Sequence, residues 1–270
     1  PMFTYDLETL RFLTVNDAAI NHYGYSTEEF LSMTIKDIRP EEEKPEFLRW
    51  MEKRKELGHL KRTSRHLKKD GEVITVELST HKLDDSNGVL VVAQDITART
   101  HAEQILSLER TVFELSNQPG VDFKNLVETL LKGFEEIYKD AFTSLILLRD
   151  DNTIESFVAH RLPNEYLQKL NGLKIGPEEG SCGTAMWQKQ TIIVEDISSH
   201  PYWEKYKSLA LHFGLHSCWS LPIIHTSGNV MGSFAVYYKK IKAPSSVELN
   251  TLERIRNIIR ILMEHHWSLN

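Results

Sequence analysis

Few residues of this chain could do covalent chemistry, and the first candidates are its two cysteines. Cys182 lies within Ser181-Cys182-Gly183, which opens a predicted helical turn, and a thiol at a helix N-terminus can have a lowered pKa and react. Cys182 and Cys218 could then form a redox pair. Two cysteines in 270 residues fit a reducing, cytoplasmic environment better than a disulfide framework.

Histidines near Cys218 raise the question of a metal site. His216 and Cys218 would share one face of a strand, so they could act as a pair of ligands. His212 lies four residues before His216, but Gly214 interrupts that spacing. With His225 included, the residues still match no strict metal motif, and we predict no metal.

Three glycines, Gly176, Gly180 and Gly183, could suggest a phosphate-binding loop. The Lys-Ser/Thr pair of a P-loop is missing, and so is the strand and helix context of a dinucleotide site. We interpret residues 175–184 as a glycine-bearing loop that turns tightly over a sheet, with a helical turn at 185–189. Gly183 is expected to allow a close backbone approach or a positive φ.

Aromatic and apolar side chains could line a ligand pocket in either half of the chain. Residues of these types more often build a plain core, which is the alternative interpretation. No residue is assigned a catalytic role. The ligand-binding candidates are Phe47, Trp50 and Met51, near Phe30, in the first half, and Cys182, Trp187, Tyr206, Cys218 and Trp219, near Trp203, in the second.

The length and composition are those of a soluble globular protein with two ordinary domains. The net charge of −6 argues against nucleic acid as a partner. No run of about 18 apolar residues could form a membrane-spanning helix, and no signal peptide is visible. Since the chain enters a strand-like segment almost at once, we expect it to be a fragment of a longer cytoplasmic protein.

Residues 1–95 predict an α+β domain with an antiparallel sheet. In 72–82, apolar residues alternate with polar ones, which predicts a strand with one buried face. Lys69-Asp70-Gly71 is typical of a tight hairpin, and Asn16 and Ser26 are typical helix N-caps. The expected order is two strands at 3–6 and 10–15, short helices, and three strands at 59–67, 72–82 and 89–93.

This segment resembles a PAS domain without its usual leading helix. The resemblance implies that Asp95-Ile96-Thr97 ends the last strand and starts an outgoing helix. PAS pockets hold haem, flavin, small acids or nothing. The residues that carry the resemblance are Val15-Asn16-Asp17-Ala18-Ala19, 23–30, Lys69-Asp70-Gly71, and Asp95-Ile96-Thr97 with Arg99.

Residues 119–270 predict a second α+β domain, with helices at 123–137, 163–170 and 201–213, and a hairpin of strands at 217–224 and 230–238. This segment resembles the GAF domains that stand beside PAS domains in bacterial histidine kinases and cyclic-di-GMP enzymes. The resemblance is carried by Ile175-Gly176, 179–185, 193–197, Pro201-Tyr202-Trp203, 218–223 and 228–235.

Against the two families, the sequence predicts no cofactor. No cysteine precedes Cys182, which excludes flavin–thiol photochemistry, and 45–57 has no histidine that could hold a haem. The stretch 206–213 has no cysteine for a covalent bilin, and the cyclic-nucleotide pattern of GAF domains is missing. Some GAF proteins reduce methionine sulfoxide through cysteines, so a redox or metal-binding protein built on Cys182 and Cys218 is the alternative.

Residues 96–118 predict a long linker helix between the two domains. Apolar residues recur there with the three-four spacing of a coiled-coil seam, and a second such seam lies near the C-terminus. We expect both seams to form a homodimer, and the alternative is that they cover a sheet within one chain. The seam residues are Ile105, Leu108, Val112 and Leu115, then Leu252, Ile255, Ile259 and Leu262.

The sequence thus predicts two α+β domains, each an antiparallel sheet of five to six strands with helices, joined by a long helix. The domains are expected at 1–95 and 119–270. We interpret the chain as a non-enzymatic sensory region of a bacterial signalling protein. A small ligand or a partner would act on it, and helices would pass the change to a histidine kinase or a diguanylate cyclase or phosphodiesterase on the same polypeptide.

Overall fold

The computed structural model describes residues 1–53, 59–83 and 86–268. The chain forms two compact units, residues 1–101 and 102–270, and the division falls within one helix, α4 (Thr97–Ser116). The helix α4 covers most of the linker predicted at 96–118, and most of α4 belongs to the second unit. The prediction of two α+β domains, each built on an antiparallel sheet, is confirmed.

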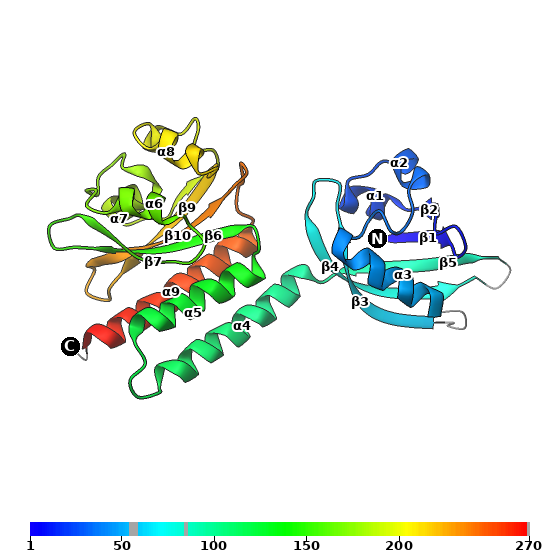
Figure 1. Ribbon diagram of the computed structural model, residues 1–270, viewed down its shortest axis with the longest axis horizontal. Helices are drawn as coiled ribbons and strands as arrows, with labels where there is room; N and C mark the ends of the chain where they lie inside the picture. Colours follow the sequence, from blue (N-terminus) through cyan, green and yellow to red (C-terminus); the bar gives the residue numbers. More distant parts are fainter. Residues whose placement is uncertain (54–58, 84–85, 269–270) are drawn as a thin grey trace. The chain divides into compact units, whose positions relative to one another are not determined.

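In the first unit, the described residues form one antiparallel sheet in the order β2-β1-β5-β4-β3 (Figure 1). Its core gathers Phe3, Tyr23, Phe30, Val76 and Val91 from the sheet and the short helices. The strands are β1 (Met2–Asp6), β2 (Phe12–Val15), β3 (His59–Leu67), β4 (Val73–Lys82) and β5 (Gly88–Asp95), and the helices are α1 (Asp17–Tyr23), α2 (Thr27–Ser32), η1 (Glu41–Glu43) and α3 (Lys44–Lys53).

Local sequence signals set the short helices of this unit. Asn16 accepts a hydrogen bond from the Ala19 backbone and begins α1, which ends at Gly24 with φ of 81°. Ser26 and Glu29 form a reciprocal capping box at the start of α2. These predicted boundaries are confirmed because each one depends only on a few neighbouring residues.

In the second unit, the described residues form a sheet in the order β7-β6-β10-β9-β8. Helices lie on both faces: α5, α9 and the second-unit part of α4 on one, and α6, α7 and α8 on the other (Figure 1). The strands are β6 (Ala141–Leu148), β7 (Ile154–Ala159), β8 (Ile192–Val194), β9 (Ser217–Ile224) and β10 (Val230–Tyr238), and the helices are α5 (Phe123–Ile137), α6 (Asn164–Leu170), α7 (Gly180–Gln188), η2 (Pro201–Trp203), α8 (Lys207–His212) and α9 (Ser246–Ser268).

Two predictions for this unit gave the wrong bounds for a loop and a helix. The predicted loop at 175–184 ends earlier, because α7 already begins at Gly180, which has φ of 64°. The predicted helix at 201–213 is broken into η2 and α8. Gly183 does meet the expectation of a close approach, since a Cβ there would lie 2.8 Å from the Glu179 Cβ, but the positive φ belongs to Gly180.

The two central strands, β9 and β10, are buried along nearly their whole length on both faces. Trp219, Leu221, Phe234 and Val236 face α4, α5 and α9. Their sequence neighbours, such as Cys218 and Tyr237, face α6, α7 and α8. The sheet is therefore a common wall between two separate apolar layers.

Gly232 of β10 pairs with Leu147 of β6, next to an irregularity in the pairing of β10 with β9. A Cβ at this position would lie against the Ile146 carbonyl oxygen, far inside van der Waals contact. We expect Gly232→Ala to lower the free energy of unfolding by about 3 kcal/mol, measured by urea denaturation, because backbone atoms must shift. The control is Gly228→Ala, which lies in open space at φ of 89° and should cost only about 1 kcal/mol. Equal losses would contradict this packing argument.

Candidate functional site

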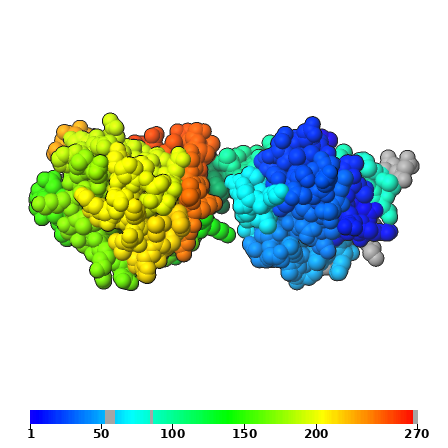
Figure 2. Space-filling view, turned by 90° about the horizontal axis from the view of Figure 1, so that it is seen from above, coloured from blue at the N-terminus to red at the C-terminus, as the bar shows by residue number. Residues whose placement is uncertain are grey.

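A cavity in the second unit lies between the sheet and the layer of α6, α7 and α8. It encloses about 450 Å³ of space between atoms, part of which is open to solvent. Ile146, Ile154, Leu170 and Leu209 supply much of its apolar wall. Figure 2 shows the face of the unit formed by residues near 200, coloured yellow, which include η2 and α8.

Four buried polar side chains of this cavity come from α6, α7 and β10. Tyr166, Ser181, Cys182 and Tyr237 all line it and are buried. The Tyr166 hydroxyl makes no hydrogen bond of standard geometry with the described residues. Burial raises the pKa of Tyr166 well above its usual value, so the hydroxyl is neutral and can donate a hydrogen bond.

The two thiols lie in one buried polar cluster with Ser220. Cys182 Sγ lies 3.0 Å from Ser220 Oγ and 3.8 Å from the Tyr237 hydroxyl, and Cys218 Sγ lies 3.7 Å from Ser220 Oγ. Both cysteines are free. Burial raises the pKa of the Cys218 thiol, whereas a hydrogen bond from Cys218 lowers the pKa of Cys182. A thiolate in this cluster would therefore form at Cys182.

Hydrogen bonds join η2 to α7 and to the sheet. Trp203 Nε1 donates to Ser181 Oγ over 2.9 Å, and Ser181 Oγ donates to the Cys218 carbonyl oxygen over 3.2 Å. Gly180 allows this turn, because its φ of 64° lies in the left-handed region that favours glycine. The start of α7 thus fixes one wall of the cavity.

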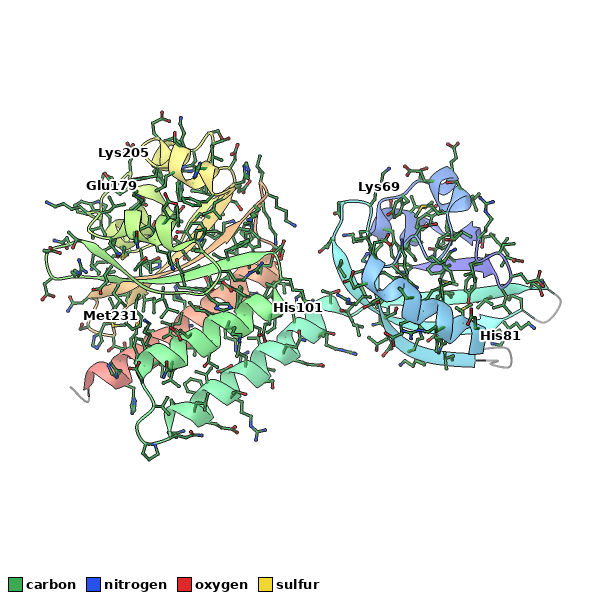
Figure 3. The ribbon with its side chains drawn as sticks, in the orientation of Figure 1. Lys69, His81, His101, Glu179, Lys205 and Met231 are labelled. Carbon is green, nitrogen blue, oxygen red and sulfur yellow. The ribbon has the colours of Figure 1, made fainter. Side chains whose placement is uncertain are left out.

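Glu179 links the start of α7 to the segment that precedes α8. It lines the cavity and forms an ion pair with Lys205, and both residues are labelled in Figure 3. Its carboxylate also accepts a hydrogen bond from the Tyr206 hydroxyl. The hydrogen bonds from Lys205 and Tyr206 lower the pKa of Glu179, and burial and this carboxylate raise the pKa of Tyr206 to about 12. The Glu179 carboxylate is therefore already paired with Lys205 and Tyr206.

Comparisons with known proteins place both units in families. The family model described as "GAF domain" matches residues 120–264, more than half of the chain. The chain belongs to the GAF-domain family. The family model described as "PAS domain" matches residues 1–98, so a PAS domain precedes the GAF domain. The predicted tandem PAS–GAF sensory region is confirmed.

A relative named methyl sulfide methyltransferase-associated sensor, from Methanosarcina acetivorans, is 28% identical over 257 residues. The match covers 91% of this chain, which spans only 26% of the relative's length. The GAF fold is also that of the free methionine-R-sulfoxide reductase from Neisseria meningitidis, at 15% identity and a TM-score of 0.52, covering 64% of this chain and 93% of that one. The GAF domain of an Acinetobacter phosphoenolpyruvate-protein phosphotransferase matches at 15% identity and a TM-score of 0.50, covering 63% and 96%.

Of the five candidates in the GAF domain, the cavity brings together Cys182 and Tyr206. Cys218 lies behind Ser220 in the same polar cluster. Trp187 and Trp219 are not part of it. Trp187 is 57% exposed, and Trp219 lies on the opposite face of the sheet, where its Nε1 donates to the Lys242 carbonyl oxygen over 3.1 Å.

The PAS domain has a partly open cavity of its own, with about 340 Å³ of space not filled by atoms when the adjoining solvent is included. Phe47 and Trp50 line this cavity as predicted, whereas Met51 packs at the edge of the domain core. Sequence reasoning missed two of its buried polar residues, Arg39 and His66. Both sit among ordinary loop and strand residues, so no local pattern distinguishes them from surface side chains.

The eight seam residues pack within the GAF-domain unit. Six of them are buried in the core between the sheet and the helices of one chain. Leu108 and Leu115 are partly buried against the same core. Their spacing therefore reflects packing inside one chain, and these side chains are not free to form a dimer interface. The six are Ile105, Val112, Leu252, Ile255, Ile259 and Leu262.

No helix in the described ranges is long and apolar enough to cross a membrane. Within those same ranges, no three histidine, cysteine or acidic side chains come together as metal ligands would. His212, His216 and His225, considered above, are therefore not grouped with Cys218 around a common point.

The thiol cluster predicts unequal reactivity. Cys182 lines the cavity and is 8% exposed, whereas Cys218 is fully buried. We expect a small thiol reagent at pH 8 to label Cys182 at least about ten times faster than Cys218 in the folded protein, because thiolate and access both favour Cys182. Labelling in urea, where both should react alike, is the control. Peptide mass spectrometry that finds Cys218 labelled first would contradict the assignment.

Proposed function

We propose that the chain is a non-enzymatic input module whose GAF cavity binds a small, largely apolar molecule with one hydrogen-bonding group. The Tyr166 hydroxyl carries this proposal. It is buried in the wall of a mostly apolar cavity, and its interaction with the Tyr237 hydroxyl does not reach the geometry of a standard hydrogen bond. A buried polar group without a partner costs about 1–3 kcal/mol, and a ligand that accepts its hydrogen bond recovers that energy.

The ligand's effect would pass through the sheet to the helices. Tyr237 lines the cavity, while its neighbours in β10, Val236 and Tyr238, pack in the helix-facing layer. Tyr238 also lies against the Trp219 ring, at 4.7 Å between centroids. Because a packed interior does not compress freely, a shift of Tyr237 would be felt in that layer.

The helices α4 and α9 would carry the change onward. Arg254 of α9 donates a hydrogen bond to Glu109 of α4 over 2.7 Å. Apolar side chains of the two helices also pack in the same core. The chain spans about a quarter of its relative, which is named a sensor, and this supports an effector on the same polypeptide. We propose a bacterial, cytoplasmic protein with a histidine kinase or a cyclic-di-GMP enzyme as that effector.

Burial favours this role over the redox alternative. Cys218 is fully buried and does not line the cavity, so a sulfoxide in the cavity would reach only one of the two thiols. The likeness to a methionine sulfoxide reductase, at 15% identity, concerns the fold alone. The thiols are better explained as part of the cavity's polar wall.

A blocked cavity tests the ligand proposal. We expect a ligand-observed NMR screen of small, uncharged apolar molecules to give binders that Leu209→Trp no longer binds, because the larger ring fills the cavity. Leu211→Trp is the matched control, since Leu211 lies on the same helix but does not line the cavity. Binders should also slow amide hydrogen exchange in α9. A screen without binders, or binders that Leu209→Trp retains, would refute the proposal.

A homodimer remains part of the proposal, but its surface must differ from the predicted seams. Leu106 on α4 and Ile261 on α9 are 50% and 44% exposed. Exposed apolar side chains on two helices are candidates for contact with a second copy. A charge at Ile259, which is fully buried, would instead damage the fold of a single chain.

We therefore expect Leu106→Glu with Ile261→Glu to give folded monomers by analytical ultracentrifugation, while the wild-type chain is a dimer at about 50 μM. The added charges face solvent in a monomer, so melting temperatures should change little. Lys124→Glu, on exposed α5 surface, serves as the control. A monomeric wild-type chain would rule out this dimer for residues 1–270.

A further inference from the structure

Arg39 of the PAS domain is a buried cation that forms no ion pair with any carboxylate of the described residues. It is 5% exposed, and its only hydrogen bond by a side-chain group within the described residues goes from Nη1 to Ser64 Oγ. Its Nε has no partner. Glu43, whose charge acts on Arg39, is itself paired with Arg65. Leaving a buried charge unpaired is costly, so an anionic ligand would stabilise this site.

A second guanidinium lines the same cavity. The Arg39 guanidinium lies 3.9 Å from the centre of the Phe47 ring, and that of Arg62 lies 4.0 Å from the centre of the Trp50 ring. Burial, and then the charge of Arg62, lower the pKa of Arg39 to about 10. Arg39 therefore remains charged at neutral pH, and the two cations repel each other across the cavity.

His66 adds a neutral polar group to this wall. It is 1% exposed, its Nδ1 lies 2.7 Å from the Tyr23 hydroxyl, and its Nε2 has no partner. Burial and the nearby arginines lower the pKa of His66 well below its usual value, so the ring is neutral. When Tyr23 donates to Nδ1, the proton of the ring is on Nε2 and can be donated to a ligand.

The rest of the cavity is mostly apolar. A ligand there meets hydrocarbon and aromatic side chains around one cationic region, so it needs one anionic group and an apolar body. A dicarboxylate would leave a second charge buried in apolar surroundings, and inorganic phosphate would leave the apolar wall unfilled. The apolar lining includes Phe3, Ile35, Ile38, Leu78 and Val91.

We propose that the PAS cavity is a binding site for a monocarboxylate with a compact aromatic or branched aliphatic body. The carboxylate accepts hydrogen bonds from Arg39 and Arg62, whose planar guanidinium groups match its two oxygens. His66 Nε2 donates to the same anion, and the aromatic side chains of α3 contact the body. This site lies in a different domain from the GAF cavity, and binding here does not depend on the function proposed above.

The wild-type chain provides the first test, by calorimetry and thermal unfolding with defined probes. Benzoate and isovalerate should bind and raise the melting temperature. Benzamide, which has the shape of benzoate without its charge, should bind at least about 30 times more weakly, and succinate and inorganic phosphate should not bind. Equal binding of benzamide and benzoate, or no binding of either monocarboxylate, overturns the proposal.

The second test replaces the buried cation. Arg39→Met should weaken benzoate binding at least about 30-fold, while the unliganded variant melts at or above the wild-type temperature, because an unpaired buried charge is gone. Arg49→Met is the control, since Arg49 is exposed on α3 and does not line the cavity, and it should bind like wild type. Should Arg39→Met fail to fold, Arg39→Lys keeps the charge and should still weaken binding about tenfold.

Variants of the other cavity separate this proposal from the function of the GAF domain. Leu209→Trp should bind benzoate like the wild type, and Arg39→Met should retain the uncharged GAF binders. Benzoate binding that disappears in Leu209→Trp but persists in Arg39→Met would place the anion site in the GAF domain and refute the assignment to Arg39.

Discussion

The GAF domain depends on two inner strands of its sheet, β9 and β10, that are buried on both faces. Polar-out, apolar-in alternation stabilises a sheet with one solvated face, but β9 and β10 have no solvated face over nearly all of their length. Each residue must fit one of two closed layers. Gly232 shows how tight this fit is, because no side chain can be placed between β10 and β6 at that point.

This two-sided burial also explains why a ligand could act at a distance in such a domain. The cavity and the helix layer share β10 as a wall, and consecutive residues of the strand belong to opposite sides. A ligand shifts an equilibrium only by as much as it binds one arrangement better than another. In the proposed mechanism, a change in the position of Tyr237 would act on the helix layer through side-chain packing.

The sequence predicted features that are set by residues close together in the chain, and it failed for features that are set by tertiary packing. The caps Asn16 and Ser26 and most of the strands were predicted because neighbouring residues determine them. The coiled-coil spacing in α4 and α9 was interpreted as a homodimer seam, whereas the side chains pack in the core of one chain. The same spacing serves packing within a chain and between chains. Trp187 and Trp219 were assigned to a pocket because spacing does not say which face of a sheet or helix meets the cavity.

The residues that distinguish the two cavities were the hardest to predict. Arg39 lies beside a proline and three glutamates, where a charged side chain is usually solvated, and only the fold brings it under Phe47. Tyr166 in the GAF cavity is buried by a comparable long-range effect. One cavity presents an unpaired cation and the other a neutral hydroxyl, so each domain disfavours the ligand that suits its neighbour. If both proposals hold, this tandem would respond to two chemically different molecules, because a charge is costly to bury where nothing opposes it.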